Sequence, residues 1–327
     1  SYPMIVVVCY FGITPWNMNR LSIDESDLSF SILIFGIFFV LSNQIAGRIL
    51  VPKYGTKLVM SLAFPLITFS TLLSIISPSY FYFLLTFIPA GIGWGASGPI
   101  GGIHCQLIEQ HFKKIITPYY AMGFNIGILV GGGLAGIIMR YSFEPFMFFL
   151  VLSFSSILVA LLVLHLGLPS NLDFKGKGEK FKIPESNVLI FGFILFFVFG
   201  SGGIIMDWST LWLSKDLNAP LYLASMGLIF FSIGGILANL FSNSLIDLFS
   251  EKVVGCHFVM IGASIMLLSL LTNNFYIILV VLCIYGFAIA NLVPIVIRQA
   301  VKQSNESIPM TVTNLITIGL SSTMIMQ

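Results

Sequence analysis

The sequence is poor in charged residues: Asp, Glu, Lys and Arg make up 9% of its 327 residues, whereas 57% are hydrophobic. A soluble globular domain typically carries about 25% charged residues, so this shortage excludes the soluble class. Composition alone therefore indicates an integral membrane protein that is surrounded by the lipid bilayer. The formal net charge of +2 points to no particular partner, and we expect none among nucleic acids.

Cysteine is also scarce, and its spacing excludes several kinds of chemistry. The four cysteines are far apart and form no CxxC or Cys/His pattern: Cys9, Cys105, Cys256 and Cys283. We interpret them as packing residues and predict no disulfide, no metal site and no cofactor. The sequence has no HExxH motif and no nucleophile elbow, and the group His104, Glu109 and His111 is typical of a solvated helix end. We therefore do not expect an enzyme.

Long apolar runs are what the sequence does contain. A membrane-spanning helix needs roughly 20 mostly apolar residues, and in lipid its backbone groups must be paired within the segment. We therefore predict an all-α membrane protein, a two-half helical bundle with about eleven spans present. The predicted spans are residues 2–16, 28–50, 57–76, 80–107, 117–140, 143–167, 187–213, 221–243, 253–271, 275–300 and 308–327.

One polar stretch, 169–186, separates the sixth span from the seventh. If it lies in the cytoplasm, twelve of the fifteen Lys and Arg side chains fall on the cytoplasmic side, as the positive-inside rule requires. We predict an N-terminal six-helix half (1–168), a cytoplasmic linker (169–186) and an incomplete C-terminal half (187–327), as in a fragment without its twelfth span. An eleven-span protein is the alternative. We expect a monomer in the bacterial inner membrane.

The loops after the second and eighth spans occupy equivalent places in the two predicted halves. They read VPKYGTK over 51–57 and IDLFSEK over 246–252. Both resemble the loop motif G-x-L-x-D-R-x-G-R-R of the major facilitator superfamily, whose charges at helix ends stabilise one conformation of those transporters. Five residues match the motif or carry a charge at the end of the loop, as the motif does: Lys53, Gly55, Lys57, Asp247 and Lys252. Pro52, Leu248 and Ser250 depart from it, and a pair of solvated basic turns is the alternative.

A narrower resemblance is to the fucose-permease-like branch, which includes YbjJ-like inner-membrane proteins. It rests on Trp16 to Arg20 at the end of the first span, on Asp207 and Trp208 near the end of the seventh, and on the glycines of the fifth. The resemblance implies a secondary active or facilitative transporter of a small solute, sugar-like or amphipathic, that works by alternating access. A non-transporting membrane sensor or assembly factor on the same fold is the alternative.

The chain departs from this branch where its proton-coupled members carry embedded polar residues. The E-x-x-x-N positions of the fourth span fall at Gly98 and Gly102, and an acidic position of the seventh falls at Gly202. Proton coupling is therefore not expected by that route. Facilitated diffusion, or coupling through Asp207 or His104, stays open.

Glycine is concentrated in the fourth and fifth spans. Gly123, Gly127 and Gly131 repeat every four residues, a spacing that favours close helix packing and also suits a sliding interface. The run GWGASG over 93–98 matches the G-x-G-x-x-G pattern, but it lies inside an apolar span without the strand that a dinucleotide site needs. We interpret it as a close-packed or broken helix.

Polar side chains in the spans are the candidates for solute contact. We predict that a cavity is lined by Trp16, Asn17, Arg20, Asn125, Asp207, Trp208 and Asn291. Amides and indoles suit hydroxyl-rich or amphipathic solutes through hydrogen bonds and stacking. For Asp207 two interpretations stand: an interfacial carboxylate beside a Trp, or a residue turned over the cavity mouth by a helix break at nearby glycines.

Overall fold

The chain is helical throughout the residues that a computed structural model describes, namely 2–113, 116–167, 173 and 184–325. No strand occurs among them, which confirms the all-α prediction. Contacts group the helices into two units that we describe separately. The α5 unit contains residues 18–117, 145–201 and 297–327, and the α10 unit contains residues 1–17, 118–144 and 202–296.

Eight helical runs are long and apolar enough to cross a membrane, within the part of the chain that is described. Two shorter apolar helices, α1 (Tyr2–Gly12) and α15 (Ile308–Leu320), match the first and last predicted spans. The run Glu25–Ile75 contains two predicted spans joined end to end. The backbone leaves the helical region inside this run at Gly55, with φ 80° and ψ 163°, so the loop expected between the two spans is a single sharp bend.

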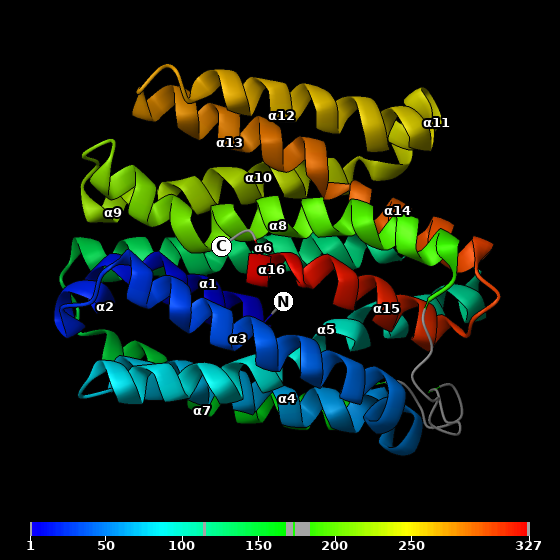
Figure 1. Cartoon of the computed structure of the whole chain (residues 1–327), viewed down its shortest axis with the longest axis horizontal. Coiled ribbons are helices and arrows are strands. Elements are labelled where there is room, and N and C mark those ends of the chain that lie inside the picture. Colours follow the sequence, from blue (N-terminus) through cyan, green and yellow to red (C-terminus); the bar gives the residue numbers. More distant parts are fainter. Residues whose placement is uncertain (1, 114–115, 168–172, 174–183, 326–327) are drawn as a thin grey trace. The chain divides into compact units, whose positions relative to one another are not determined.

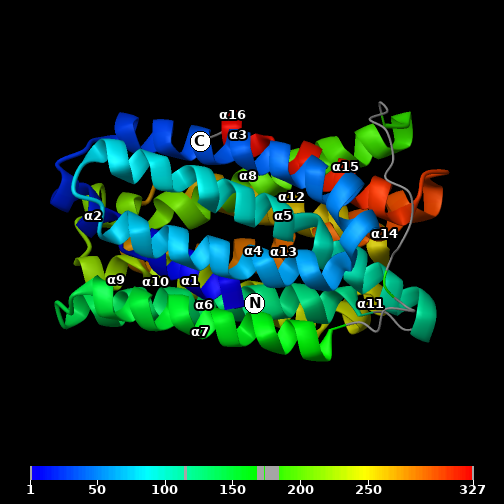
Figure 2. The same ribbon diagram turned by 90° about the horizontal axis from the view of Figure 1, so that it is seen from below.

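The α5 unit is built around its longest helix. Its helices are α3 (Glu25–Ile45), η1 (Ala46–Leu50), α4 (Val51–Ile75), α5 (Tyr80–Phe112), α7 (Pro145–Leu166), α15 and α16 (Ser322–Ile325). It also contains the first part of α8 (Ser186–Lys215) and the last part of α14 (Leu292–Gln303). Helices α3 and α4 both contact α5, and α7 packs on α4 (Figures 1 and 2).

Glycines set the close approach of α5 to its neighbours. A Cβ atom at Gly91 or Gly95 would lie within 3.0 Å of a backbone carbonyl oxygen of α3, and one at Gly93 would lie 2.9 Å from Ile67 of α4. Such contacts allow only glycine, because no side chain fits between the backbones. The G-x-G-x-x-G run is thus a packing surface within an unbroken helix, so of the two interpretations the close-packed helix holds and the broken helix does not.

The α10 unit has α10 and α13 at its centre. Its helices are α1, α6 (Thr117–Arg140), α9 (Leu221–Ala224), α10 (Met226–Leu240), α11 (Ser242–Lys252), η2 (Val253–His257), α12 (Phe258–Ser269) and α13 (Phe275–Ala290), with parts of α2 (Thr14–Leu21), α8 and α14. A Cβ at Gly234 or at Gly286 would meet the backbone of the other helix, so α10 and α13 are in backbone contact (Figure 1).

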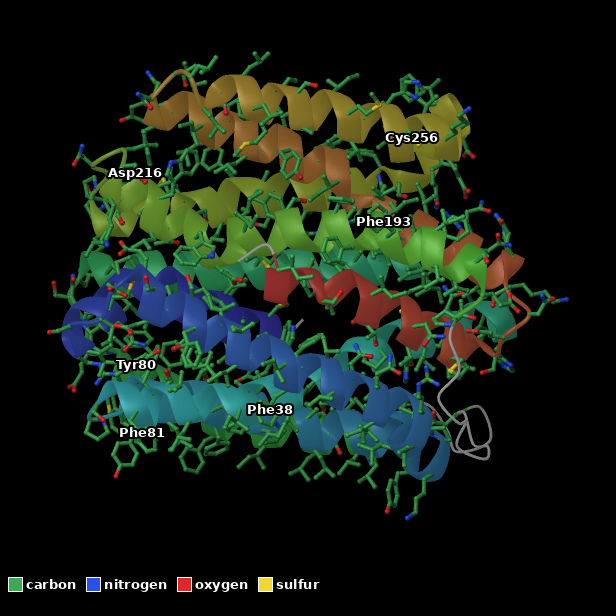
Figure 3. All side chains as sticks on the ribbon, viewed as in Figure 1. Phe38, Tyr80, Phe81, Phe193, Asp216 and Cys256 are labelled. Carbon is green, nitrogen blue, oxygen red and sulfur yellow. The ribbon has the colours of Figure 1, made fainter. Side chains whose placement is uncertain are left out.

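Apolar side chains cover the outside of several helices, as lipid contact requires. On α7, Leu158 is 63% exposed, and on α12, Leu267 is 67% exposed. Phe81 of α5 is 62% exposed, and its ring points away from the helix (Figure 3). An aqueous surface would not tolerate so many exposed apolar side chains, whereas a bilayer favours them.

Candidate functional site

A buried polar network joins α3 and η1 to α15 inside the α5 unit. We call it the α3–α15 network, and its members are Asn43, Gln44, Arg48, Glu306, Asn314 and Thr317. Arg48 donates from Nε to Gln44 Oε1 at 2.5 Å and from a terminal nitrogen to Asn314 Oδ1 at 2.8 Å. Asn314 Nδ2 donates in turn to Glu306 Oε2 at 3.0 Å. A chain of hydrogen bonds therefore connects a guanidinium to a carboxylate through one amide.

The same network continues toward the middle of α3. Gln44 Nε2 donates to Thr317 Oγ1 at 2.5 Å, and the Thr317 hydroxyl donates to Asn43 Oδ1 at 3.2 Å. Asn43 is fully buried, and Arg48 is 6% exposed. Charged side chains within a membrane helix are costly unless they are paired, and they usually mark functional positions. Sequence reasoning counted Arg48 only as a cytoplasmic charge, because its partners lie more than 260 residues away.

Apolar contacts seal α5 against α15 beside this network. A Cβ at Gly102 would lie 2.9 Å from Val312 Cγ1, and one at Gly98 would lie 3.7 Å from Ile316 Cγ2. These are the two positions at which the resembling branch carries embedded polar residues. A Cβ at Gly98 would also lie 3.5 Å from Asn43 Nδ2, so this position borders the polar network, whereas Gly102 packs against Val312 alone among the described residues.

The first motif loop is shaped by Gly55 and by Asp173 of the predicted linker. Asp173 Oδ1 accepts hydrogen bonds from Thr56 N at 3.1 Å and from Thr56 Oγ1 at 2.8 Å. His104 Nδ1 lies 3.2 Å from the same hydroxyl. A carboxylate that binds a backbone N–H where a helix resumes acts as a helix cap. The rest of the linker, apart from residues 184–186, lies outside the described residues.

The charged side chains of each motif loop lie at the surface or pack beside neighbouring residues of the same unit. Lys53 is exposed and its Nζ lies 5.0 Å from the centre of the Tyr54 ring, while Lys57 packs beside Gly167. Asp247 and Lys252 of the second loop are exposed on α11.

The two motif loops share one backbone geometry. Ser250 stands where Gly55 stands in the first loop, and it has φ 73° and ψ 155°. This left-handed region is easy for glycine and strained for residues with a Cβ, at about 1–2 kcal/mol. Both loops therefore make the same bend, although the second does so without glycine.

The predicted residues of the first span lie in α2. Asn17 is buried and donates to the Tyr10 hydroxyl at 3.4 Å, and Trp16 beside it is half-buried. Arg20 is exposed and donates to the carbonyl oxygens of Ser77 at 2.5 Å and Ser74 at 3.1 Å. Since these carbonyls end α4, Arg20 caps a helix C-terminus, where a positive charge is favoured.

Asp207 and Trp208 lie in the part of α8 that belongs to the α10 unit. Asp207 is 8% exposed and Trp208 is half-buried. Helix α8 runs without a break from Ser186 to Lys215, so the suggested interruption at its glycines does not occur. Asp207 is a buried carboxylate on a regular helix.

The glycines and the amide of α6 contact different neighbours within the α10 unit. A Cβ at Gly131 would lie 2.6 Å from the carbonyl oxygen of Ile5 in α1, whereas Gly123 has open space beside it. The Asn125 amide lies against α10, because a Cβ at Gly235 would be 2.5 Å from Asn125 Oδ1. Its Nδ2 donates to the Ala121 carbonyl at 3.1 Å.

Two further amides are buried where α10 and α13 end. Asn291 follows the last residue of α13 and donates from Nδ2 to the Ala238 carbonyl at 3.0 Å. Its Oδ1, and both Nδ2 and Oδ1 of Asn239, have no hydrogen-bond partner among the described residues. Both side chains are 2% exposed. A buried polar group without a partner costs about 1–3 kcal/mol, so these atoms call for an explanation.

The acidic and histidine residues near the C-terminal end of α5 have structural partners. Glu109 Oε1 accepts from Ile116 N, Thr117 N and Thr117 Oγ1 at 2.6–2.7 Å, which caps the start of α6. Among the described residues no group of three His, Cys, Asp or Glu side chains is placed to hold a metal ion. At this end of α5 the geometry of Glu109 is that of a helix cap.

Apolar helices of spanning length around a buried polar network define a class, the polytopic membrane proteins. The family follows from the sequence match: residues 4–326 fit the Major Facilitator Superfamily, and the chain belongs to that family. An uncharacterized MFS-type transporter of Yersinia pestis is 22% identical over 317 residues, which cover 94% of this chain and 79% of the relative.

Solved structures show the same fold at low identity. A D-xylose-proton symporter superposes with a TM-score of 0.71 at 14% identity and covers 99% of this chain and 85% of its own. A nucleoside transporter has a TM-score of 0.66 at 12% identity, with coverages of 100% and 89%. A bacterial homologue of the human lysosomal transporter Spinster, in an inward-facing and unoccupied conformation, has a TM-score of 0.66 at 15% identity, with coverages of 99% and 78%.

Proposed function

We propose that this protein carries a small neutral solute, rich in hydroxyl groups, across the bacterial inner membrane by alternating access of two six-helix halves. The α3–α15 network is the observation that carries the proposal. It joins span two of the predicted first half to span eleven of the predicted second half through buried hydrogen bonds. A contact of this kind forms in one state of a rocking transporter and breaks in the other.

The positive-inside rule places this contact at the cytoplasmic side, with the linker 169–186. When the network is formed, it holds the halves together at that side; when it breaks, Arg48 and Asn314 become open to water. Water then replaces the lost hydrogen bonds, so the cost of opening is smaller than the gross strength of the bonds. The network is thus suited to a reversible closure.

The solute class is inferred from the side chains that the spans bury. In the α10 unit, Asn125, Asn239 and Asn291 are buried carboxamides, which donate and accept hydrogen bonds without net charge. Such groups suit neutral hydroxyl-bearing solutes better than ions. The named solutes of two structural neighbours, D-xylose and nucleosides, fall in this class. The narrower kinship with the fucose-permease-like branch belongs to this proposal too, as does the monomeric state.

A cross-link between the halves tests alternating access directly. In a background with the native cysteines replaced, Gly102→Cys and Val312→Cys form the test pair, because the built Cβ at Gly102 lies 2.9 Å from Val312 Cγ1. The sulfur of a cysteine at position 312 would take the place of Val312 Cγ1. Its distance from the Cβ at position 102 suits a disulfide bond, in which the two Cβ atoms are about 3.5–4.5 Å apart. We expect oxidation to abolish uptake of labelled D-xylose or uridine into proteoliposomes, and reduction to restore it.

The matched control is a cross-link inside one predicted half. Thr68→Cys and Ser156→Cys join α4 to α7, where the two native hydroxyl oxygens are 2.7 Å apart. This pair should form its disulfide and leave uptake unchanged. Full uptake by the oxidised Gly102–Val312 pair would refute movement of one half against the other. Solute binding without any flux in the unmodified protein would favour a sensor or assembly factor.

A further inference from the structure

We propose that Asn239 is a specificity-determining residue of this transporter and binds a pair of adjacent hydroxyl groups of the solute together with Asn291. The inference deepens the proposed function and rests on it. Asn239 is 98% buried, yet neither its amide nitrogen nor its amide oxygen has a hydrogen-bond partner within the described residues. Asn291 Oδ1 also has no hydrogen-bond partner among the described residues.

The register of α10 places Asn239 on the side of that helix that faces α6. Leu228 and Gly235 lie on this side, since a Cβ at Gly132 of α6 would be 3.2 Å from Leu228 Cβ and the Asn125 amide lies against Gly235. Asn239 follows Gly235 by four residues and shares its face. It is therefore one helical turn further along the α6–α10 contact.

Asn291 reaches the same level of α10 from α13. Its Nδ2 donates to the carbonyl oxygen of Ala238, the residue next to Asn239. Both asparagines lie near a helix boundary, since Asn291 stands between α13 and α14 and Asn239 is the residue before the last of α10. Backbone hydrogen bonds continue across both boundaries, so the two amides lie on helical backbone.

The free polar atoms define the chemistry of the ligand. One amide nitrogen offers two donors, and two amide oxygens act as acceptors, with no formal charge among them. A vicinal diol supplies both donors and acceptors at adjacent atoms, and it pairs with a carboxamide in a two-point contact. An inorganic ion would use only one kind of these atoms. We therefore assign sugars and ribonucleosides as the solute class.

Replacing Asn239 separates a binding role from a structural one. Asn239→Leu keeps the number and branching of the side-chain heavy atoms and removes two buried polar atoms without partners, so the ligand-free protein should melt at the same temperature or higher. Binding should weaken by about tenfold or more, because one side of the two-point contact is lost. Asn239→Ala is the second variant if the leucine variant is recovered poorly.

The probes are radiolabelled D-xylose, L-fucose, D-glucose and uridine, with 2′-deoxyuridine as a competitor that lacks the diol. Binding to purified full-length chain and counterflow in proteoliposomes are measured alongside the melting temperature. The control is Ser269→Ala on α12, which is equally buried but bonded within its own helix to the Met266 carbonyl at 2.7 Å. It should leave binding unchanged.

The outcomes are distinct. Wild-type binding of a diol probe that is lost in Asn239→Leu, with no fall in melting temperature, supports the assignment. Equal binding by wild type and both Asn239 variants overturns it while the proposed transport function stands. Absence of binding and counterflow for every probe in wild type overturns both the diol site and the proposed solute class.

Discussion

Removing the Arg48 guanidinium should open the α5 unit at the α3–α15 network. Arg48→Met keeps much of the length and apolar surface of the side chain but loses the hydrogen bonds to Gln44 and Asn314. Hydrogen bonds from a charged donor contribute about 1.5–3 kcal/mol each. The native guanidinium gains hydration when the contact opens, so we take the lower end of the summed range, roughly 3 kcal/mol. This free energy corresponds to about a hundredfold shift toward the open state.

Cys105 reports the opening. It is 5% exposed and lies one helical turn beyond Gly102, whose face contacts Val312 of α15. In a variant where Cys105 is the only cysteine, its rate of labelling by N-ethylmaleimide measures the open population. We expect the rate to rise at least tenfold in Arg48→Met, because the ~3 kcal/mol estimate is uncertain by a factor of two.

The control for this measurement is Lys302→Met, which removes one exposed positive charge from α14 without touching the network. It should label at the wild-type rate, since an isolated surface charge contributes little. If Arg48→Met and Lys302→Met label equally slowly, the network does not hold α3 to α15, and the reasoning from buried hydrogen bonds is refuted.

Two further predictions concern the helix bends and packing. Ser250→Gly should stabilise the protein by about 1 kcal/mol, because glycine adopts φ 73° without strain; an unchanged or lower melting temperature would contradict this. Gly95→Ala should destabilise it by about 2 kcal/mol or more, because the new Cβ would strike the Phe39 carbonyl oxygen. Its matched control, Gly123→Ala, has open space and should melt like wild type in the same detergent; equal melting of both variants would count against the close α3–α5 contact.

The fold could be predicted well from the sequence because the signal for a membrane span lies within one contiguous stretch of residues. Each span is a contiguous apolar run, and lipid leaves a helix as the only way to pair its backbone. Gly55 was recognised as a motif glycine and Ser250 as the residue that replaces it in the second loop, but only the structure showed the same sharp bend at both. The orientation of the linker and the division into halves stay predictions.

Candidate site residues were harder to assign, because a polar residue in a span has several possible partners. Arg20 was predicted to line a cavity, yet it caps α4, whose end only the folded chain brings beside it. Asn125 lies against Gly235 of a helix about a hundred residues away. The spacing of residues within one helix gives no information about such contacts.

What the sequence by itself determined is the membrane class, the apolar spans and the family, since these depend on composition, run length and a loop motif. Only the tertiary structure decided that Arg48 is a buried network residue and that Asn239 is buried without a hydrogen-bond partner. The physical reason is that the hydrogen bonds and the burial of a side chain depend on which other residues the folded chain places beside it. Arg48 and Asn314 are 266 residues apart, and no local pattern records which distant side chain will satisfy a donor or leave it unsatisfied.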